Sequence, residues 1–171
     1  MAALDAFTTL LDPPMYVVTA TADDGERAGC LIGFASQSSI HPARFTVWLS
    51  RANRTYRVAC RASYLTVHLL TTEHRETARL FGEETGDEID KFARVDWEPG
   101  YAGSPVLADS AGWFTGTVEA RFDGGDHVGF LLSPVAEGRH DEAAGATGPG
   151  DTGPRLFVLS DADRFSPGHP A

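Results

Sequence analysis

The sequence predicts a mainly β fold, an antiparallel barrel with a few short helices inserted between its strands. About seven segments are β-rich or alternate apolar with polar residues, as half-buried strands do. Glycine-containing turn signals join several of these segments as hairpins. The strand–helix–strand rhythm of a parallel sheet is missing, as are GxGxxG and Walker patterns, so we do not expect a Rossmann or P-loop nucleotide site.

The first four strands are expected in the N-terminal half. Residues 15–22 (MYVVTATA) and 27–36 (RAGCLIGFAS) flank the turn signal DDG and form the first predicted hairpin. Residues 44–50 (RFTVWLS) and 64–70 (YLTVHLL) alternate apolar and polar positions, so each is predicted to be a half-buried strand.

Three short helices are expected. The first links the strands at 44–50 and 64–70, with Asn53 as N-cap and with Tyr56, Ala59 and Cys60 on one face. The second covers residues 71–82 and ends at a glycine, and a shorter third helix is predicted over DEIDKFARV, residues 87–95.

The C-terminal part contains the second predicted hairpin, with strands at 112–122 and 126–137 around the turn DGG. Residues 138–154 contain no apolar side chain larger than alanine apart from proline, so they are expected to form a flexible insertion loop. Residues 155–159 (RLFVL) are predicted to be the last strand, and the tail after them is expected to fray.

Length and composition favour one soluble domain over residues 1–171. No apolar stretch is long enough to cross a membrane, and Asp5 stands where a signal peptide carries basic residues. The two cysteines, Cys30 and Cys60, suit a reducing compartment, so a cytoplasmic location is expected. The net charge of −10 argues against nucleic acid or an anionic membrane as a partner.

The charge is unevenly distributed along the chain. Residues 27–72 contain no Asp or Glu but carry six arginines: Arg27, Arg44, Arg51, Arg54, Arg57 and Arg61. Such a window in an acidic chain suggests a local pocket for a small anion. The alternative is a core-rich segment whose arginines stay solvated.

Two polar stretches fall inside this window. ASQSSIHP, residues 35–42, offers hydroxyls and an amide suited to a polar heterocycle or a phosphate. On its own the stretch favours the alternative, a hydrophilic connection before a proline. SRANRT, residues 50–55, begins a predicted helix, where backbone N–H groups and arginines suit a phosphate. Its alternative is an ordinary capped helix start facing solvent.

A third stretch, GDH at residues 125–127, places a histidine at the mouth of the predicted barrel. His127 could donate a hydrogen bond or transfer a proton near neutral pH, or it could be incidental to a hairpin turn. The other histidines are scattered without metal-ligand spacing, and no GxSxG elbow is present, so neither a metal site nor serine hydrolysis is expected.

In this order and spacing the stretches resemble the flavin reductase family with the FMN-binding split-barrel fold. The resemblance runs from about Pro14 to Glu137 and rests on MYVVTA, GCLIGFASQSSIHP, FTVWLSRANRTYRVA, DKFARVDWEPGYAGSPVL and GDHVGF. It implies an antiparallel Greek-key split β-barrel, usually a homodimer, that transfers hydride from NADH or NADPH to FMN or FAD. Many members pass the reduced flavin to a partner monooxygenase.

The resemblance also implies roles for individual residues. The backbone of Gly33, Phe34 and Ala35 would line the flavin ring, and Ser36, Gln37 and Ser39 would contact the ring and its ribityl chain. Ser50, Arg51, Arg54 and Thr55 match the stretch nearest the phosphate. His127 matches the histidine near flavin and nicotinamide, where it would orient the hydride donor or stabilise reduced flavin.

Three features depart from the family pattern: His41–Ala43 replaces a frequent pair of prolines, Gln37 and Ser38 replace a serine and a small apolar residue, and residues 138–154 are inserted. Two other functions stay open. The chain could bind flavin without reducing it, as a carrier or sensor, or it could be another split-barrel oxidoreductase that acts on a small organic substrate or uses a deazaflavin.

Overall fold

A computed structural model describes residues 3–140 and 154–166. Its main element is a seven-stranded antiparallel sheet with the order β2-β1-β5-β8-β9-β4-β3. The strands are β1 (Tyr16–Thr21), β2 (Arg27–Ile32), β3 (Ala35–Ser39), β4 (Arg44–Ser50), β5 (Tyr64–Leu69), β8 (Gly112–Asp123) and β9 (His127–Arg139). β6 (Trp97–Pro99) and β7 (Pro105–Leu107) form a separate antiparallel pair.

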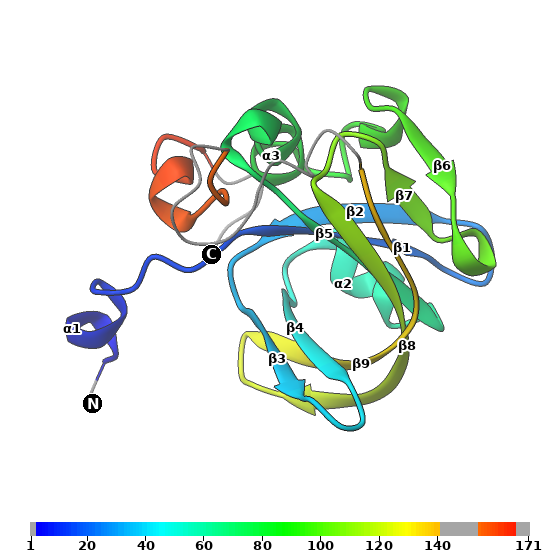
Figure 1. Ribbon diagram of the computed structural model, residues 1–171, viewed down its shortest axis with the longest axis horizontal. Helices are drawn as coiled ribbons and strands as arrows, with labels where there is room; N and C mark the ends of the chain where they lie inside the picture. Colours follow the sequence, from blue (N-terminus) through cyan, green and yellow to red (C-terminus); the bar gives the residue numbers. More distant parts are fainter. Residues whose placement is uncertain (1–2, 141–153, 167–171) are drawn as a thin grey trace.

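The sheet curls into a barrel, with β3, β4 and β9 on the side opposite β1 and β2 (Figure 1). One apolar cluster shows this closure, because it joins Val18 of β1 and Cys30 of β2 to Leu49 of β4 and Phe130 of β9. Helix α2 (Arg54–Ala59) contributes Val58 and Ala59 to the same cluster. The predicted antiparallel, mainly β architecture is therefore confirmed.

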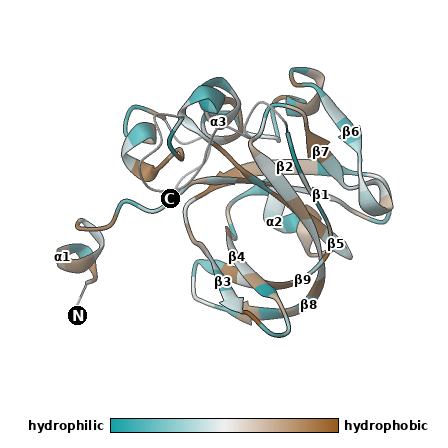
Figure 2. Cartoon of the chain, viewed as in Figure 1, coloured by the Kyte–Doolittle hydropathy of each residue, from teal (hydrophilic) through white to brown (hydrophobic). Residues whose placement is uncertain are grey.

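A second apolar cluster lies on the outer side of β1, where Val17 packs with Phe81 of helix α3 (Arg75–Glu83), Phe92 and Phe157. Val17 and Val18 point to opposite faces and both are buried, so β1 is covered on both sides. Figure 2 shows the brown, apolar colouring concentrated along the strands of the barrel.

The two predicted hairpins are confirmed, as β1–β2 and β8–β9. The first predicted helix is confirmed as α2, where the Asn53 carboxamide oxygen accepts a hydrogen bond from the Thr55 N–H at 2.9 Å. Of the residues expected on one face of this helix, Ala59 is buried and Cys60 is exposed, and the helix also buries Thr55 and Val58. The second predicted helix corresponds to the 3-10 turn Thr72–His74 followed by α3.

Several expectations need correction. The second strand ends at Ile32, and Ala35–Ser39, expected as its polar end and connection, forms a separate strand at the sheet edge. The third helix is only a 3-10 turn, Lys91–Ala93, which begins at the Asp90 cap. Residues 155–159 form two isolated bridges, Thr71↔Leu156 and Pro14↔Val158, instead of a strand. Pro13 and Pro14 lack the N–H groups that would extend the second of them.

The chain ends also contain elements that the sequence pattern did not predict. A short helix, α1 (Asp5–Thr8), precedes the first strand, and a 3-10 turn, Leu159–Ala162, lies in the expected tail. The predicted insertion loop begins later than expected because β9 continues to Arg139, and residues 141–153 lie outside the described residues. Within the described part of the chain, no helix has the length and hydropathy needed to span a membrane.

Candidate functional site

The structure brings together two stretches that are far apart in the sequence, SRANRT and GDH. Ser50, the last residue of β4, pairs with His127, the first residue of β9. The Arg51 N–H donates a hydrogen bond to the Asp126 carbonyl at 2.9 Å, and its guanidinium donates to the Gly125 carbonyl at 2.8 Å. A phosphate candidate, Arg51, therefore holds the turn that carries His127.

His127 lies in a shallow pocket at this end of the barrel. The pocket has a volume of about 290 Å³ and is lined by Phe34, Trp48, Gly124, Asp126 and His127. The His127 ring centroid is 5.1 Å from that of Phe34, and 29% of its side chain is exposed. The imidazole is thus packed on one side and accessible to a ligand on the other.

Asp126 fixes the orientation of the His127 ring. Its Oδ1 lies 2.7 Å from Nδ1 of His127, so the Nδ1–H donates to the carboxylate and Nε2 is left for another partner. The same hydrogen bond lowers the pKa of the Asp126 carboxyl. With Nδ1 held by the carboxylate, Nε2 is the ring nitrogen left to meet a ligand, which suits a hydrogen-bonding or proton-transfer partner.

Trp48 forms the floor of the pocket, and the sequence analysis did not identify it. A Cβ built on Gly124 would lie 2.5 Å from Trp48 Cζ3, and one built on Gly129 would lie 3.0 Å from Cζ3 and Cη2. Both glycines are needed because the indole lies against the hairpin backbone where a side chain would otherwise stand. The sequence signal for Trp48 is a large aromatic residue among the polar positions of the strand at 44–50. The sequence analysis used that residue only as part of the alternating pattern.

The predicted ring-contacting residues lie on and beside the edge strand β3. Ser36 and Gln37 are exposed, whereas Ala35 and Ser39 are half-buried. Phe34 precedes the strand, and its carbonyl accepts a hydrogen bond from the Trp48 N–H at 2.9 Å, which connects β3 to the pocket. A Cβ on Gly33 would meet the Met15 sulfur at 3.0 Å, so Gly33 allows close packing rather than an open approach.

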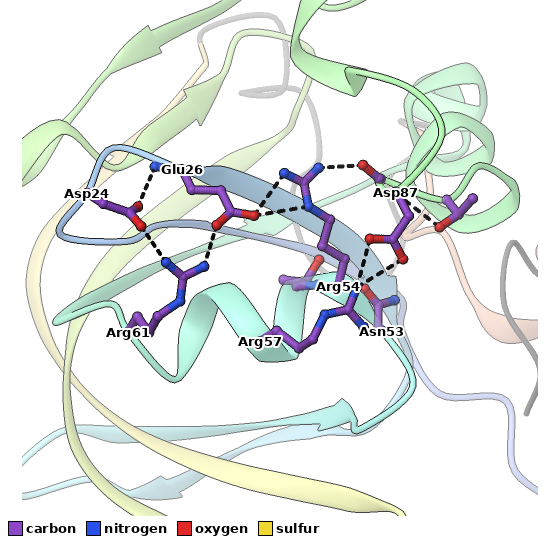
Figure 3. A network of polar contacts seen from close by, with 10 residues as sticks. Asp24, Glu26, Asn53, Arg54, Arg57, Arg61 and Asp87 are labelled. Atoms are coloured by element: carbon purple, nitrogen blue, oxygen red, sulfur yellow. Dashed lines mark hydrogen bonds and ion pairs between the residues drawn. The ribbon is translucent and has the colours of Figure 1, made fainter.

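Arg54 and Thr55 point elsewhere. The Arg54 guanidinium bonds the Glu26 carboxylate at 2.9 Å and donates to the Gly86 carbonyl (Figure 3). With Glu26 and Gly86 it lines a separate pocket that shares no residue with the His127 pocket. Thr55 is buried, with 1% of its surface exposed. Of the residues predicted for the phosphate, Ser50 and Arg51 therefore lie beside His127, whereas Arg54 and Thr55 face other parts of the fold.

Carboxylates from outside the acid-free window balance most of its charge. Arg57 pairs with Asp87 at 2.7 Å, and Arg61 pairs with Asp24 and Glu26 (Figure 3). Hydrogen bonds from Arg61 and then Arg54 lower the pKa of the Glu26 carboxyl. The arginines on and beside α2 are therefore neutralised by carboxylates. They do not form the positively charged anion pocket that the sequence suggested.

The remaining two ion pairs of the window lie at opposite ends of β4, and only that of Arg51 is beside the pocket. Arg44 pairs with Glu119 at 3.0 Å, and Arg51 pairs with Asp123 at 3.0 Å. Arg51 is the more accessible of these arginines, with 43% of its side chain exposed, and its partner Asp123 is itself 78% exposed. Across the described residues, no group of three His, Cys, Asp or Glu side chains has an arrangement that could hold a metal ion.

Comparison with known proteins relates the whole barrel to one family. The family described as "Flavin reductase like domain" matches residues 10–157. The chain is similar to a probable flavin reductase from Rhizobium meliloti, with 31% identity over 116 residues, 66% of this chain and 36% of that protein. It is also similar to the reductase subunit HsaB of a flavin-dependent monooxygenase from Mycobacterium tuberculosis, with 31% identity over 115 residues, 65% of this chain and 57% of that protein.

A third relative is a flavin reductase (NADH) from Kitasatospora aureofaciens, 31% identical over 128 residues, which cover 74% of this chain and 65% of that protein. The chain spans 36% of the length of the Rhizobium meliloti relative and 57% of the length of the Mycobacterium tuberculosis relative.

Solved structures share the fold. An FMN-binding protein from Thermus thermophilus superposes with a TM-score of 0.80 at 18% identity, covering 93% of this chain and 87% of that one. The NADH:FAD oxidoreductase SgcE6 of Streptomyces globisporus has a TM-score of 0.72 at 19% identity, covering 93% and 84%.

Proposed function

This chain belongs to the flavin reductase like domain family, and from that premise we propose that it catalyses hydride transfer from a nicotinamide nucleotide to FMN or FAD. The observation that carries the proposal is the pairing of Ser50 with His127. This pairing puts the Ser50 hydroxyl and the Arg51 guanidinium beside the turn whose imidazole, bonded to Asp126, lines an open pocket.

The residues around the pocket suit the parts of a flavin. The hydroxyl and amide groups of Ser36, Gln37 and Ser39 on β3 would hydrogen-bond the polar edge of the ring and the ribityl chain. Phe34 and Trp48 offer apolar surface beside them. Bound flavin would supply the redox chemistry, accepting the hydride at N5.

Arg51 is the strongest candidate for holding the flavin phosphate. Its side chain is accessible and can exchange the exposed Asp123 carboxylate for a phosphate oxygen. Arg54 would first have to leave Glu26 and the Gly86 carbonyl, and the Thr55 N–H already donates to Asn53. Ser50, Arg54 and Thr55 are therefore proposed as secondary contacts.

His127 is proposed as the catalytic residue. With Nδ1 bonded to Asp126, its Nε2 is the atom left to meet the nicotinamide carboxamide or the reduced flavin. It would orient the hydride donor or stabilise negative charge that develops on the flavin.

The donor and the partners follow from the names of relatives. NADH is the proposed donor because one relative is named flavin reductase (NADH), and NADPH is the alternative. A monooxygenase partner is proposed from the relative named as a monooxygenase reductase subunit. We propose a homodimer, as the family resemblance implies.

The test is a visible absorption spectrum of the purified protein with FMN or FAD, recorded anaerobically before and after NADH and then NADPH. Rapid bleaching of the flavin band at catalytic protein concentration supports the reductase. Flavin that binds but stays oxidised with both donors would identify a binding module, and a chain that neither binds nor reduces flavin would overturn the proposal.

A further inference from the structure

An aromatic strip crosses the outer face of the sheet beside the pocket described above. Trp48 of β4 and Phe122 of β8 are both paired with Gly129 of β9, so the three residues form one row across three strands. Residues that lie directly opposite each other in antiparallel strands point to the same face. Leu49 and Phe130, the sequence neighbours of Trp48 and Gly129, are fully buried, so the row faces away from the core.

A glycine in the middle of the row leaves this strip open. The Trp48 indole covers Gly129, where an added Cβ would lie 3.0 Å from Cζ3 and Cη2, and it extends to Gly124 in the turn between β8 and β9. Phe122 stands on the other side of Gly129 and keeps 45% of its surface exposed. The aromatic floor of the His127 pocket therefore continues onto β8 as an accessible apolar surface.

The strip lies within reach of a ligand held at His127. His127 and Gly129 are two positions apart on β9, so they share a face and lie about 7 Å apart. Exposed aromatic side chains bind heteroaromatic rings by stacking. A nicotinamide dinucleotide carries a second such ring, adenine, on a flexible chain. A donor with its nicotinamide at His127 can therefore place its adenine on Trp48 and Phe122.

A carboxylate borders the strip on the side of the turn. Asp123 follows Phe122 in sequence, 78% of its side chain is exposed, and one oxygen is bonded to Arg51 at 3.0 Å. Hydrogen bonds from the Gly125 N–H and then from Arg51 lower the pKa of this carboxyl, so it is ionised at neutral pH. A carboxylate accepts hydrogen bonds from ribose hydroxyls, whereas it repels the additional phosphate that NADPH carries on its adenosine ribose.

We propose that the aromatic strip, formed by Trp48 and Phe122 around Gly129, seats the adenine of the hydride donor, and that Asp123 beside it selects NADH over NADPH. The inference rests on the proposed reductase function and adds a site for the half of the donor that takes no part in hydride transfer. Two aromatic side chains match the size of a single base. They offer far less surface than a protein partner needs.

Phe122→Ala tests the adenine seat by comparing two donors. Reduced nicotinamide mononucleotide carries the same hydride but no adenosine, so wild type should use NADH at least about tenfold more efficiently, measured as kcat/KM. Phe122→Ala should lower kcat/KM for NADH about tenfold and leave that for the mononucleotide and the affinity for FMN unchanged. A wild type that uses both donors equally, or a variant that loses both equally, would overturn the adenine seat while the reductase function stands.

Tyr101→Ala is the matched control for this substitution. Tyr101 is as exposed as Phe122, at 46%, but it lies in the turn between β6 and β7. The control should therefore use both donors as wild type does. Circular dichroism spectra that match wild type would show that both variants are folded.

Binding of ADP-ribose tests the same site without redox chemistry, because this ligand has the adenosine half of the donor and no nicotinamide. By titration calorimetry, Phe122→Ala should weaken its affinity about tenfold and Tyr101→Ala should not. Unchanged binding in Phe122→Ala would overturn the proposal, and a lower mass of that variant in light scattering would then assign the strip to a contact between copies. A wild type that binds ADP-ribose through Phe122 but reduces no flavin would contradict the reductase function alone.

Asp123→Asn tests the choice between NADH and NADPH. The asparagine oxygen still accepts the Gly125 N–H, so the turn keeps this hydrogen bond while the charge is lost. The ratio of kcat/KM for NADPH to that for NADH should rise about fivefold or more. Asp87→Asn removes another exposed carboxylate that is paired with an arginine, Arg57, and should leave the ratio unchanged. A wild type that prefers NADPH, or an unchanged ratio in Asp123→Asn, would contradict selection by Asp123.

Discussion

Ser50 and His127 lie opposite each other in the β4–β9 pair, and Arg51 next to them donates hydrogen bonds to the turn that carries the histidine. This relationship joins the proposed phosphate end and the proposed catalytic residue in one small region. A change at either side is therefore expected to affect flavin chemistry, but through different steps.

His127→Ala should lower the turnover of flavin reduction roughly 10- to 100-fold while leaving flavin affinity within about threefold of wild type, because the imidazole acts on the donor or on developing charge. Steady-state kinetics and a fluorescence titration with FMN measure the two quantities. His41→Ala, at an exposed histidine outside the pocket, is the control. Unchanged turnover in His127→Ala would remove the catalytic role.

Arg51→Ala should weaken FMN binding about tenfold or more, since a charge-assisted hydrogen bond to phosphate is lost. Riboflavin, which lacks the phosphate, should bind both proteins with similar affinity, and this comparison also checks that the turn at Gly125 keeps its shape. Arg57→Ala removes an arginine paired with Asp87 on α2 and should leave FMN binding unchanged. Equal losses for FMN and riboflavin would assign Arg51 to the turn alone.

Gly124→Ala and Gly125→Ala should both destabilise the fold, for different reasons. At Gly124 the new Cβ meets Trp48 at 2.5 Å and the His127 carbonyl at 2.9 Å, which should cost about 1–3 kcal/mol. Gly125 has open space but a φ of +106°, so its substitution should cost about 1–2 kcal/mol through backbone strain. Urea unfolding measures both.

The two causes separate in a Trp48→Leu background. The cost of Gly124→Ala should fall there because part of the steric conflict has gone, whereas the cost of Gly125→Ala should stay the same. If both costs are unchanged, Trp48 does not occupy the space above Gly124 in solution.

His68 should make stability depend on pH between about 4 and 6.5. Burial lowers the pKa of this histidine from 6.5 to about 4. Its Nδ1–H donates to the Val17 carbonyl and its Nε2 accepts from the Leu107 N–H, both at 3.0 Å, so protonation would break the second bond. The unfolded chain binds a proton below pH 6.5 and the folded chain does not until about pH 4.

The free energy of unfolding should consequently fall by about 3 kcal/mol as the pH drops from 7 to 4. His68→Gln should flatten this dependence, while His41→Gln should keep the wild-type slope. The carboxylate of Asp161, whose pKa is lowered to about 2 by hydrogen bonds from Arg155, acts only below this window. A wild-type stability that is constant from pH 7 to 4 would contradict the buried neutral histidine.

The parts of the fold that could be predicted are those in which local pattern and burial agree. Alternating residues and glycine turns identified the β1–β2 and β8–β9 hairpins, because each strand has at least one face in the core. β3 was missed as a strand because Ser36 and Gln37 are exposed on a sheet edge, so no apolar period marks it. The pair β6–β7 was missed because each strand is only three residues long.

Residues of the candidate site could be predicted from the sequence, but their positions relative to one another could not. Resemblance supplied His127 and Arg51, yet their proximity follows from the β4–β9 register, which no sequence spacing encodes. Arg54 and Arg57 form ion pairs with Glu26 and Asp87, which come from outside the acid-free window. These pairs depend on the three-dimensional fold and could not be predicted from the sequence. Trp48 was overlooked because its packing depends on glycines from another hairpin.

Trp48 also gives the pocket an intrinsic fluorescence signal. Its indole forms the floor beside Phe34 and His127, whereas Trp97 and Trp113 do not line this pocket. An oxidised flavin seated there would absorb the emission of the indole and quench it. A chain with Trp97 and Trp113 replaced by phenylalanine would then report occupancy of the site from its own fluorescence, with no added label.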